Sequence, residues 1–550
     1  MTRLKLKLDF WTIITLVIAV LFSLFLIYPL FSLFISGFKD AVSGAFTFNN
    51  FIKFFQKKYY YQGLINSFMI TSLVTVLSVL IGAPLAYLMT AYKIKGKKLI
   101  EILIIISLMS PPFIGAYSWV LLSGRSGVLT KFFESIGIHM PSIYGFGGIL
   151  LVLTLKLYPF IYLYVSGALK KVDVSLSEAA ESLGCNAVKK VFTIMLPLIG
   201  PTLLAGSLLV FMNALADFGT PMLIGEGFNV MPVMIYSEFI SEVGGQANFS
   251  AAMATLMVFI TALLFLGQKY IVNKKSFTMS SLRPIQPSSF KGIRGILAHA
   301  AIYFVVLLAI IPQLTVFITS FLETKGSRFI AAFSMESYKQ VVTTLWKSIT
   351  NTYLLGLAAI LLIVLLGMFI AYLSTRKKNV LTSIIDATTM FPYILPGSVL
   401  GITLLLAFNK KPLLLSGTIT IMIIAYIVRR LPYTLRSSAA ILYQLSPSME
   451  EASISLGCSP VKTFFKVTAV MMMPGVLAGA ILSWITVINE LSASIILYTG
   501  STKTMSVAIY TEVVRSSYGT AAAISSILTA TTIISLLIFF KLSGSRSVSV

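Results

Sequence analysis

The sequence predicts an all-α polytopic membrane protein with about 12 transmembrane helices, built as two parallel six-helix repeats. Composition is the first observation: of 550 residues, 57% are hydrophobic and 11% are charged, and the mean hydropathy is +0.93. Soluble domains do not have this composition. The second observation is a series of uncharged runs long enough to cross a bilayer, and the third is a repeat that relates the two halves of the chain.

The uncharged runs are expected to form helices, because lipid offers no partner to an exposed backbone N–H or C=O group. They also lack the alternating pattern of a membrane β-barrel. A helix needs roughly 20 residues to cross the hydrocarbon core. On this basis the expected spans cover roughly residues 11–36, 63–92, 100–123, 146–169, 194–217 and 249–271, then 296–321, 349–375, 382–408, 413–437, 467–490 and 518–541.

The net charge of +24 does not indicate a nucleic-acid partner. Lys and Arg are more frequent in the loops on one side of the expected spans, and the positive-inside rule assigns that side to the cytoplasm. Both termini are therefore expected in the cytoplasm. The first apolar run, residues 10–38, is too long for a cleaved signal peptide and is expected to stay as a span.

The halves align at two offsets. Segment 178–201 recurs without a gap as segment 451–474, and segment 66–87 recurs at the slightly larger offset that places it on segment 351–372. Each half contains six spans and starts on the same side, so the repeat is parallel. We place the first repeat at 1–272 and the second at 295–550, joined by a polar cytoplasmic linker at 273–294 that is rich in Ser, Pro and basic residues.

Two polar segments, 172–201 and 445–474, stand at equivalent places between apolar runs. Each is expected to form a short helix, a sharp glycine turn and a second helix. On these residues alone, such an elbow either turns the chain at the membrane surface or binds another protein. The expected capping boxes are Ser175 with Glu178 and Ser448 with Glu451, the turns are at Gly184 and Gly457, and the caps of the second helices are Asn186 and Ser459.

The first polar segment resembles the EAA loop of the membrane subunits of bacterial ABC importers. It reads Glu178-Ala179-Ala180, three residues, Gly184, nine residues, Ile194, one residue, then Leu196-Pro197, which meets the spacing of that signature in full. The second segment keeps Glu451, Ala452 and Gly457 but departs from the signature at Ser453, Val467, Ala469 and Val470. The resemblance implies the type I ABC importer permease fold, with both permease halves in one chain.

The resemblance also implies partners. Two ATP-binding subunits would dock at the cytoplasmic face on the two EAA loops, and an extracytoplasmic substrate-binding protein would deliver the solute. The residues expected to couple to the ATPase are Glu178, Ala179, Ala180, Gly184, Glu451, Ala452 and Gly457. Glu178 and Glu451 would either cap their own helices or meet a basic group on the ATPase.

The chain itself is expected not to be an enzyme. No phosphate loop of the form G-x-x-x-x-G-K-[ST] occurs in it, so ATP would be used by the partner subunits and no cofactor bound here. The resemblance places the protein in a bacterial cell (inner) membrane. Segments 217–221 and 489–494 resemble the fused permeases of ferric-iron importers, which makes ferric iron the first expected solute, with 2-aminoethylphosphonate, thiamine or polyamine as alternatives.

Four ionisable residues fall inside expected spans and recur in register. Lys156 aligns with Arg429, and Asp217 with Glu490, both at the offset that relates the two polar segments. Charges are costly in a membrane and often functional there, so all four are translocation-pathway candidates. The alternative is structural pairing of each base with the acid of its own half. In an ion-coupled secondary transporter, the rival class, the two acids would be the coupling sites.

Two further residue types complete the expectations. Pro111, Pro112, Pro392 and Pro396 lie inside expected spans and predict kinks. No metal site is expected, because the chain has two distant histidines without ligand spacing. Cys185 and Cys458 occupy equivalent positions and are expected to pack rather than to bind metal or form a disulfide framework.

Overall fold

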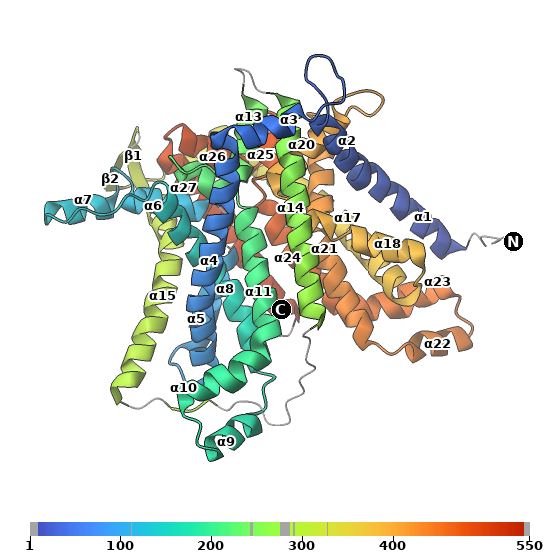
Figure 1. Cartoon of the computed structure of the whole chain (residues 1–550), viewed down its shortest axis with the longest axis horizontal. Helices are drawn as coiled ribbons and strands as arrows, with labels where there is room; N and C mark the ends of the chain where they lie inside the picture. The colour runs from blue at the N-terminus through green and yellow to red at the C-terminus, as the bar shows by residue number, and fades with distance from the viewer. Residues whose placement is uncertain are drawn as a thin grey trace. The chain divides into compact units, whose positions relative to one another are not determined.

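The computed structural model describes residues 9–109, 111, 113–241, 246–274, 287–289, 292–326 and 328–543. The described chain is predominantly helical, as predicted (Figure 1). It divides into two compact units. One contains the described residues of 1–52, 235–256 and 336–546, and the other contains those of 53–234 and 257–335.

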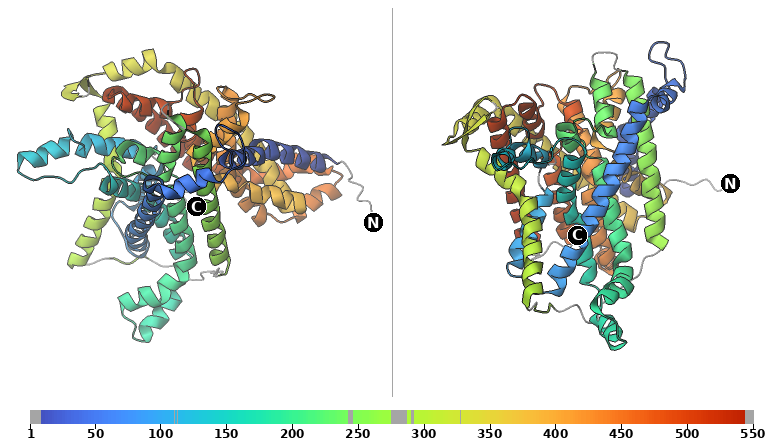
Figure 2. Two further views of the ribbon diagram at one scale, coloured as in Figure 1. Left: turned by 45° about the horizontal axis from the view of Figure 1, so that its top comes forward. Right: turned by 60° about the vertical axis from the view of Figure 1, so that its left-hand side comes forward.

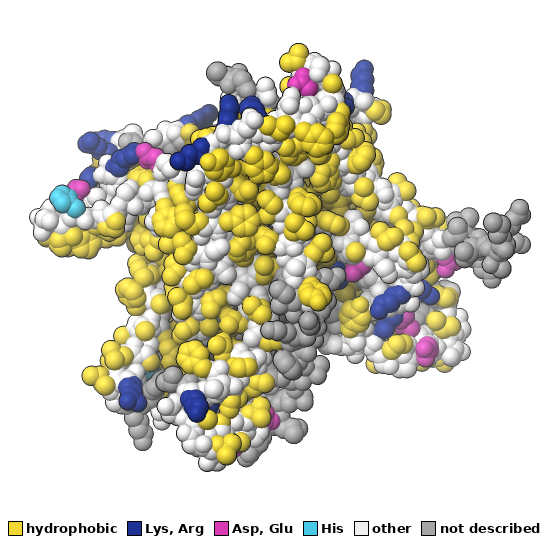
Figure 3. Space-filling view, viewed as in Figure 1, with side chains coloured by type: hydrophobic (Ala, Val, Ile, Leu, Met, Phe, Trp, Pro, Cys, Tyr) yellow, Lys and Arg dark blue, Asp and Glu magenta, His cyan; other side chains and the backbone are white. Residues whose placement is uncertain are grey.

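Among the described residues, nine helices are long and apolar enough to cross a membrane. They are formed by α1 (Phe10–Phe22) with η1 (Ser23–Ile27) and α2 (Tyr28–Gly37), α4 (Lys58–Ala91), α8 (Phe146–Leu169), η2 (Val191–Met195) with α11 (Leu196–Leu215), α14 (Ala247–Lys274), α15 (Gly292–Thr319), α17 (Trp346–Arg376), α23 (Pro460–Thr463) with η3 (Phe464–Thr468) and α24 (Ala469–Ile488), and α27 (Tyr518–Ser543). Hydrophobic side chains cover the sides of the long helices on the face drawn in Figure 3.

The three other predicted spans differ from single apolar helices. Spans 100–123 and 382–408 are broken rather than kinked, because proline lacks an N–H and disfavours helical backbone at the residue before it. The segments are α5 (Lys97–Met109) and α6 (Ile114–Ser123), and α18 (Val380–Thr388), α19 (Phe391–Ile394) and α20 (Gly397–Phe408). The breaks include Pro111 and Pro396. Pro112 lies outside the described residues.

The span predicted at 413–437 is α21 (Ile419–Gln444), which begins and ends later than expected. It carries Arg429, Arg430 and Arg436, which is why its hydropathy falls below that of the other spans. The remaining short helices are α3 (Asn49–Gln56), α7 (Val128–Ser135), α9 (Val174–Ser182), α10 (Ala187–Lys190), α12 (Gly219–Ile224), α13 (Met231–Ile240), α16 (Glu336–Thr344), α22 (Ser448–Ser455), α25 (Ser494–Leu497) and α26 (Met505–Val514).

One element departs from the all-α prediction. Strands β1 (Leu322–Lys325) and β2 (Arg328–Phe333) form an antiparallel hairpin that pairs Leu322 with Phe333. Gly326 in its turn has φ of +61°, a conformation that costs glycine little.

The compact units do not coincide with the sequence repeats. In one unit, α1 and α2 of the first repeat pack on α17, α18 and α20 of the second, and the Tyr28 hydroxyl donates to the Ala407 carbonyl over 3.4 Å. In the other unit, α15 of the second repeat packs on α5 and α6, where Ser118 Oγ donates to the Pro312 carbonyl over 2.8 Å. Most of the predicted linker, 273–294, lies outside the described residues, so the repeat boundaries stay a prediction.

Candidate functional site

The two polar segments form matching elbows, which we call loop one (172–201) and loop two (445–474). In loop one, α9 and α10 extend beyond the end of α8 and α11, a protrusion that both Figure 1 and Figure 2 show. In loop two, α22 is followed directly by α23 and η3. The predicted helix–turn–helix order is therefore present in both loops.

The predicted capping boxes are wrong. In loop one α9 begins at Val174, and the carboxylate of Asp173 accepts the N–H of Ser175 over 2.9 Å. Aspartate is as good an N-cap as serine, and it comes earlier in the chain. In loop two the residue before α22 is Pro447, which makes no side-chain cap.

The predicted glycine turns are confirmed. Gly184 and Gly457 have φ of +81° and +86°. In loop one the N–H of Gly184 donates to the Glu181 carbonyl over 2.9 Å, and that of Cys185 donates to the Ala180 carbonyl over 3.0 Å. The same two bonds recur in loop two at 2.9 and 3.1 Å. This pattern is the Schellman motif, and each cysteine is its second residue after the helix end.

The second helix of each elbow is also as predicted at its start. Asn186 Oδ1 accepts the N–H of Lys189 over 2.8 Å, and Ser459 Oγ accepts that of Lys462 over 3.3 Å. Both helices then contain a π-helical segment, η2 and η3, at aligned positions of the repeat. π-helical segments occur frequently at functional sites, and this one recurs with the elbow in both halves.

Apolar side chains are exposed on both elbows. Leu183 is 85% exposed and Leu456 is 86% exposed, each directly before its turn glycine. Among the residues predicted to couple, Glu178, Ala179, Glu451 and Ala452 are exposed, whereas Ala180 is buried. The two leucines therefore occupy equivalent exposed positions in the two elbows.

The four charged candidates form one buried ion pair in each half, as the structural alternative predicted. Lys156 Nζ lies 2.5 Å from Asp217 Oδ2, and Arg429 Nη1 lies 2.5 Å from Glu490 Oε1. The acids are the more deeply buried partners, with side chains 5% and 3% exposed. Each base is on α8 or α21, and each acid follows the long helix α11 or α24.

Each acid has a second function that the sequence did not indicate. Asp217 Oδ1 accepts the N–H of Thr220 over 2.9 Å, at the start of α12. Glu490 Oε1 accepts the N–H of Ala493 over 3.1 Å, directly before α25. A carboxylate at the beginning of a helix satisfies an N–H without an internal partner. The acids therefore hold the turn after the long helix as well as the base.

The second pair includes an arginine that sequence analysis missed. Arg430 Nη2 also contacts Glu490, through Oε2. The aligned residue of the first half is Leu157, so the repeat gave no signal for Arg430. Gly397 at the start of α20 leaves room for Arg429, because a Cβ at this position would overlap its Nη1 atom.

A repeated amide and hydroxyl brace the segment that follows each acid. Asn66 Nδ2 donates to the Asn229 carbonyl over 3.0 Å, and Ser67 Oγ accepts the N–H of Met231 over 2.8 Å. In the other half, Asn351 Nδ2 donates to the carbonyls of Ser501 and Lys503 over 2.8 and 3.0 Å. Thr352 Oγ1 accepts the N–H of Met505 over 2.7 Å.

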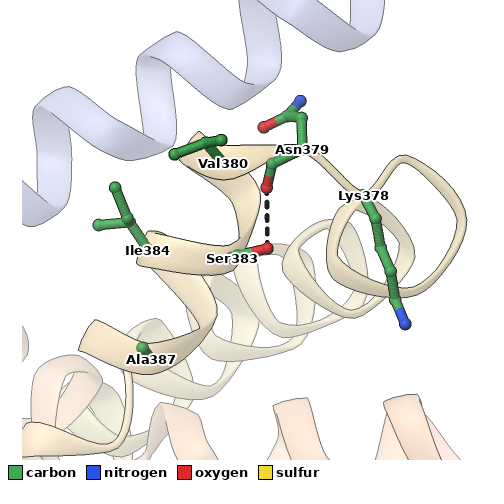
Figure 4. Close-up of a pocket in the computed structure, with 6 residues that line it drawn as sticks. All are labelled: Lys378, Asn379, Val380, Ser383, Ile384 and Ala387. Carbon is green, nitrogen blue, oxygen red and sulfur yellow. Dashed lines mark hydrogen bonds between the residues drawn. The ribbon is translucent and has the colours of Figure 1, made fainter.

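The described residues contain no group of three or more His, Cys, Asp or Glu arranged to hold a metal ion. Figure 4 shows a pocket of about 550 Å³ along α18, lined by Lys378, Asn379, Val380, Ser383, Ile384 and Ala387. Its lining includes none of the predicted site residues, and Ser383 Oγ donates to the Asn379 carbonyl over 2.8 Å within the helix itself.

Comparison with known proteins identifies a family whose matches include both elbows. The family described as binding-protein-dependent transport system inner membrane component matches residues 78–277 and 363–546, more than half of the chain. The chain belongs to this family. It is a multi-pass membrane permease component of an ABC importer rather than an enzyme, and the two matches begin at residues that the sequence repeat aligns with each other.

Several relatives have named solutes. The chain is 28% identical over 530 residues to a ferric transport system permease protein FbpB of Actinobacillus pleuropneumoniae, covering 93% of this chain and 75% of the relative. It is 28% identical over 503 residues to a putative FbpB 1 of Haemophilus influenzae, covering 88% and 78%. The spermidine/putrescine permease PotB of Haemophilus influenzae is 30% identical over 223 residues, covering 40% of this chain and 77% of PotB.

Proposed function

We propose that this permease carries ferric iron across the cell membrane in an ATP-driven importer. The observation that supports this solute most is the similarity to ferric permeases over 93% and 88% of the chain. The polyamine permease PotB aligns with 40% of it. A polyamine, 2-aminoethylphosphonate or thiamine would be the alternative cargo of the same kind of importer.

The proposal assigns the energy to separate subunits. Two ATPase subunits would bind loop one and loop two through the exposed surface of α9 and α22, and this chain would hold no cofactor of its own. Leu183 and Leu456 would enter apolar grooves, while Glu178 and Glu451 would face basic groups of the ATPase. Both loops and both termini would then lie in the cytoplasm, in keeping with the positive-inside rule.

On the opposite side a substrate-binding protein would deliver the solute. Closure of the ATPase subunits on ATP would be transmitted through α9 and α22 into α11 and α24, to which the elbows connect. We place Lys156, Asp217, Arg429 and Glu490 beside the translocation pathway, where they would keep the turns after α11 and α24 in position as the halves move.

An ion-coupled secondary transporter is the alternative of another class. Its coupling ion would need Asp217 and Glu490 as ligands, but both carboxylates already contact a base and a backbone N–H. Uptake that collapses with the ion gradient and persists without any ATPase would favour this alternative.

The test is a pull-down of the tagged chain from native membranes in mild detergent, followed by mass spectrometry. We expect a phosphate-loop ATPase at about two copies per permease. In the double variant Glu178→Lys with Glu451→Lys, the ATPase should no longer be recovered. The permease itself should stay monodisperse, because both side chains are exposed. Uptake of labelled ferric iron should fall with it. An unchanged ATPase yield and normal uptake in the variant would refute the assignment of the loops.

A further inference from the structure

Loop two is attached to its neighbouring span by a side-chain cluster at the end of α17. Arg376 Nε donates to Glu450 Oε1 over 3.1 Å, and Arg376 Nη2 donates to the Leu445 carbonyl over 2.7 Å. The Tyr372 hydroxyl donates to the other carboxylate oxygen of Glu450 over 3.3 Å. The Arg376 and Glu450 side chains are only 15% and 16% exposed, so solvent screens this ion pair less than a surface pair.

The second helix of loop two is held to the same part of α17. The ring of Tyr372 packs against Phe464, the first residue of η3, with ring centroids 4.8 Å apart. Trp11 of α1 completes the cluster at 4.6 Å from Tyr372 and 5.1 Å from Phe464. Trp11 and Phe464 are buried. Contacts from the first and the second helix of loop two therefore meet at one turn of α17.

Loop one cannot form this cluster, because three of its residues differ, although Tyr372 has the counterpart Tyr87. The positions aligned with Arg376, Glu450 and Phe464 are Ala91, Ser177 and Val191. Alanine and serine cannot form the ion pair, and valine cannot form the aromatic contacts. Loop one has an ion pair between Lys190 and Glu181 at 3.4 Å, but both residues belong to the loop itself, so this pair does not tie it to α4.

We propose that Arg376, Glu450 and Tyr372 form a latch that holds loop two in its docking position, so that the two ATPase contacts are unequal. Loop two is fixed to α17 before its ATPase subunit binds, whereas loop one has Ala91, Ser177 and Val191 at the aligned positions and loses more freedom when its subunit binds. Ordering a loop on binding reduces affinity, because the lost freedom is subtracted from the contact energy. This inference depends on the proposed function, because that function supplies the ATPase that binds loop two. The three latch residues act by positioning the loop.

The two cysteines permit a direct test, because Cys185 and Cys458 occupy the same position in the two turns and are the only cysteines of the chain. Each is spin-labelled alone, in a full-length chain with the other changed to Ser, and label mobility is measured in detergent without ATPase. We expect the label at Cys458 to be the less mobile. Equal mobility at both sites would overturn the proposal.

Variants that give loop two the residues of loop one sharpen this test. Glu450→Ser or Arg376→Ala should raise mobility at Cys458 and leave mobility at Cys185 unchanged. The exchange Arg376→Glu with Glu450→Arg should lower the mobility again only in part, because the ion pair can re-form but the bonds to the Leu445 carbonyl and from the Tyr372 hydroxyl are lost. Conversely, Ala91→Arg with Ser177→Glu should reduce mobility at Cys185. Unchanged mobility at Cys458 in both single variants would refute the latch.

Binding of the ATPase recovered in the pull-down gives the functional readout. Glu450→Ser should weaken it about ten-fold, the scale of a modest ordering cost. The mobility measurement needs no ATPase, so the two hypotheses fail separately. If no ATPase binds the wild type, the proposed function fails. If the ATPase binds wild type and Glu450→Ser equally while mobility at Cys458 rises, the latch does not set the affinity and the proposal fails.

Discussion

The two buried ion-pair sites have the same geometry but different charge counts. In the first, one lysine meets one aspartate, and in the second, two arginines meet one glutamate. In both, the acid also accepts a backbone N–H three residues further along the chain. Both halves therefore share a carboxylate that contacts a base on one long helix and a backbone N–H in the turn that follows a second long helix. The number of bases around it is free to change.

The largest effect should come from Glu490→Gln. This substitution leaves Arg429 and Arg430 together without their shared carboxylate, and removal of one partner of a buried pair costs about 3–5 kcal/mol. Asp217→Asn should cost less, because only Lys156 loses its partner and its side chain is 19% exposed. Thermal unfolding of the purified variants in detergent measures both. A larger loss for Asp217→Asn would contradict the comparison.

An additional substitution, Arg430→Leu, should reduce the loss of stability that Glu490→Gln causes. Arg430→Leu gives the second site the leucine of the first, and Arg429 still pairs with Glu490, so the single variant should change the free energy of unfolding by about 1 kcal/mol or less. In the double variant with Glu490→Gln, the loss in the free energy of unfolding should be about 2 kcal/mol smaller than in Glu490→Gln alone, because one of the two arginines without a carboxylate is removed. Additive losses in the double variant would show that the arginines do not share the carboxylate.

The asparagines that hold the segments after Asp217 and Glu490 should also contribute more to stability in the second half than in the first. Asn351→Ala removes two hydrogen bonds to backbone carbonyls and should cost about 2 kcal/mol. Asn66→Ala removes one such bond and also the bond that Asn66 Oδ1 accepts from Gln62 Nε2 over 3.0 Å, so its loss is measured in a Gln62→Ala background and should be about 1 kcal/mol there. Unfolding midpoints of the two variants provide the measurement, with Asn351→Asp as a control of similar size whose carboxylate cannot donate to either carbonyl. Equal losses would mean that the second carbonyl contact contributes nothing.

The smallest effects are expected at the turn glycines. Gly184→Ala and Gly457→Ala should each cost about 1 kcal/mol, from the positive φ alone. An added Cβ would meet nothing within 4 Å at either position, so the two losses should be equal. The comparison is made by unfolding in detergent. Unequal losses would indicate that one turn is strained by its surroundings.

Local patterns in the sequence predicted much of the site. The glycine turns at Gly184 and Gly457 and the helix caps at Asn186 and Ser459 depend on residues a few positions apart, and all are present. The ion pair between Lys156 and Asp217 could be predicted from the sequence, because a base and an acid recur at the same offset as Arg429 and Glu490. The capping boxes are absent because Asp173, two residues before Ser175, caps α9, and because Pro447, which makes no side-chain cap, precedes α22.

Other features needed the folded chain. Arg430 and Glu450 have no counterpart in the first half, so the repeat that identified the other charges could not reveal them. Prolines predicted kinks, but whether a span bends or breaks depends on what satisfies the freed backbone groups. At Pro396 the span breaks, and α20 starts at Gly397, where the missing side chain makes space for Arg429.

By itself the sequence determined the membrane class, the duplication and the elbow at each repeat, because hydrophobic length, recurrence and turn chemistry are properties of neighbouring residues. The tertiary structure decided that α1 packs on α17 and α18, that α15 packs on α5 and α6, and that Arg376 and Glu450 join loop two to α17. These contacts join residues tens to hundreds of positions apart. Side-chain packing selects such partners, and hydropathy does not distinguish one apolar helix from another.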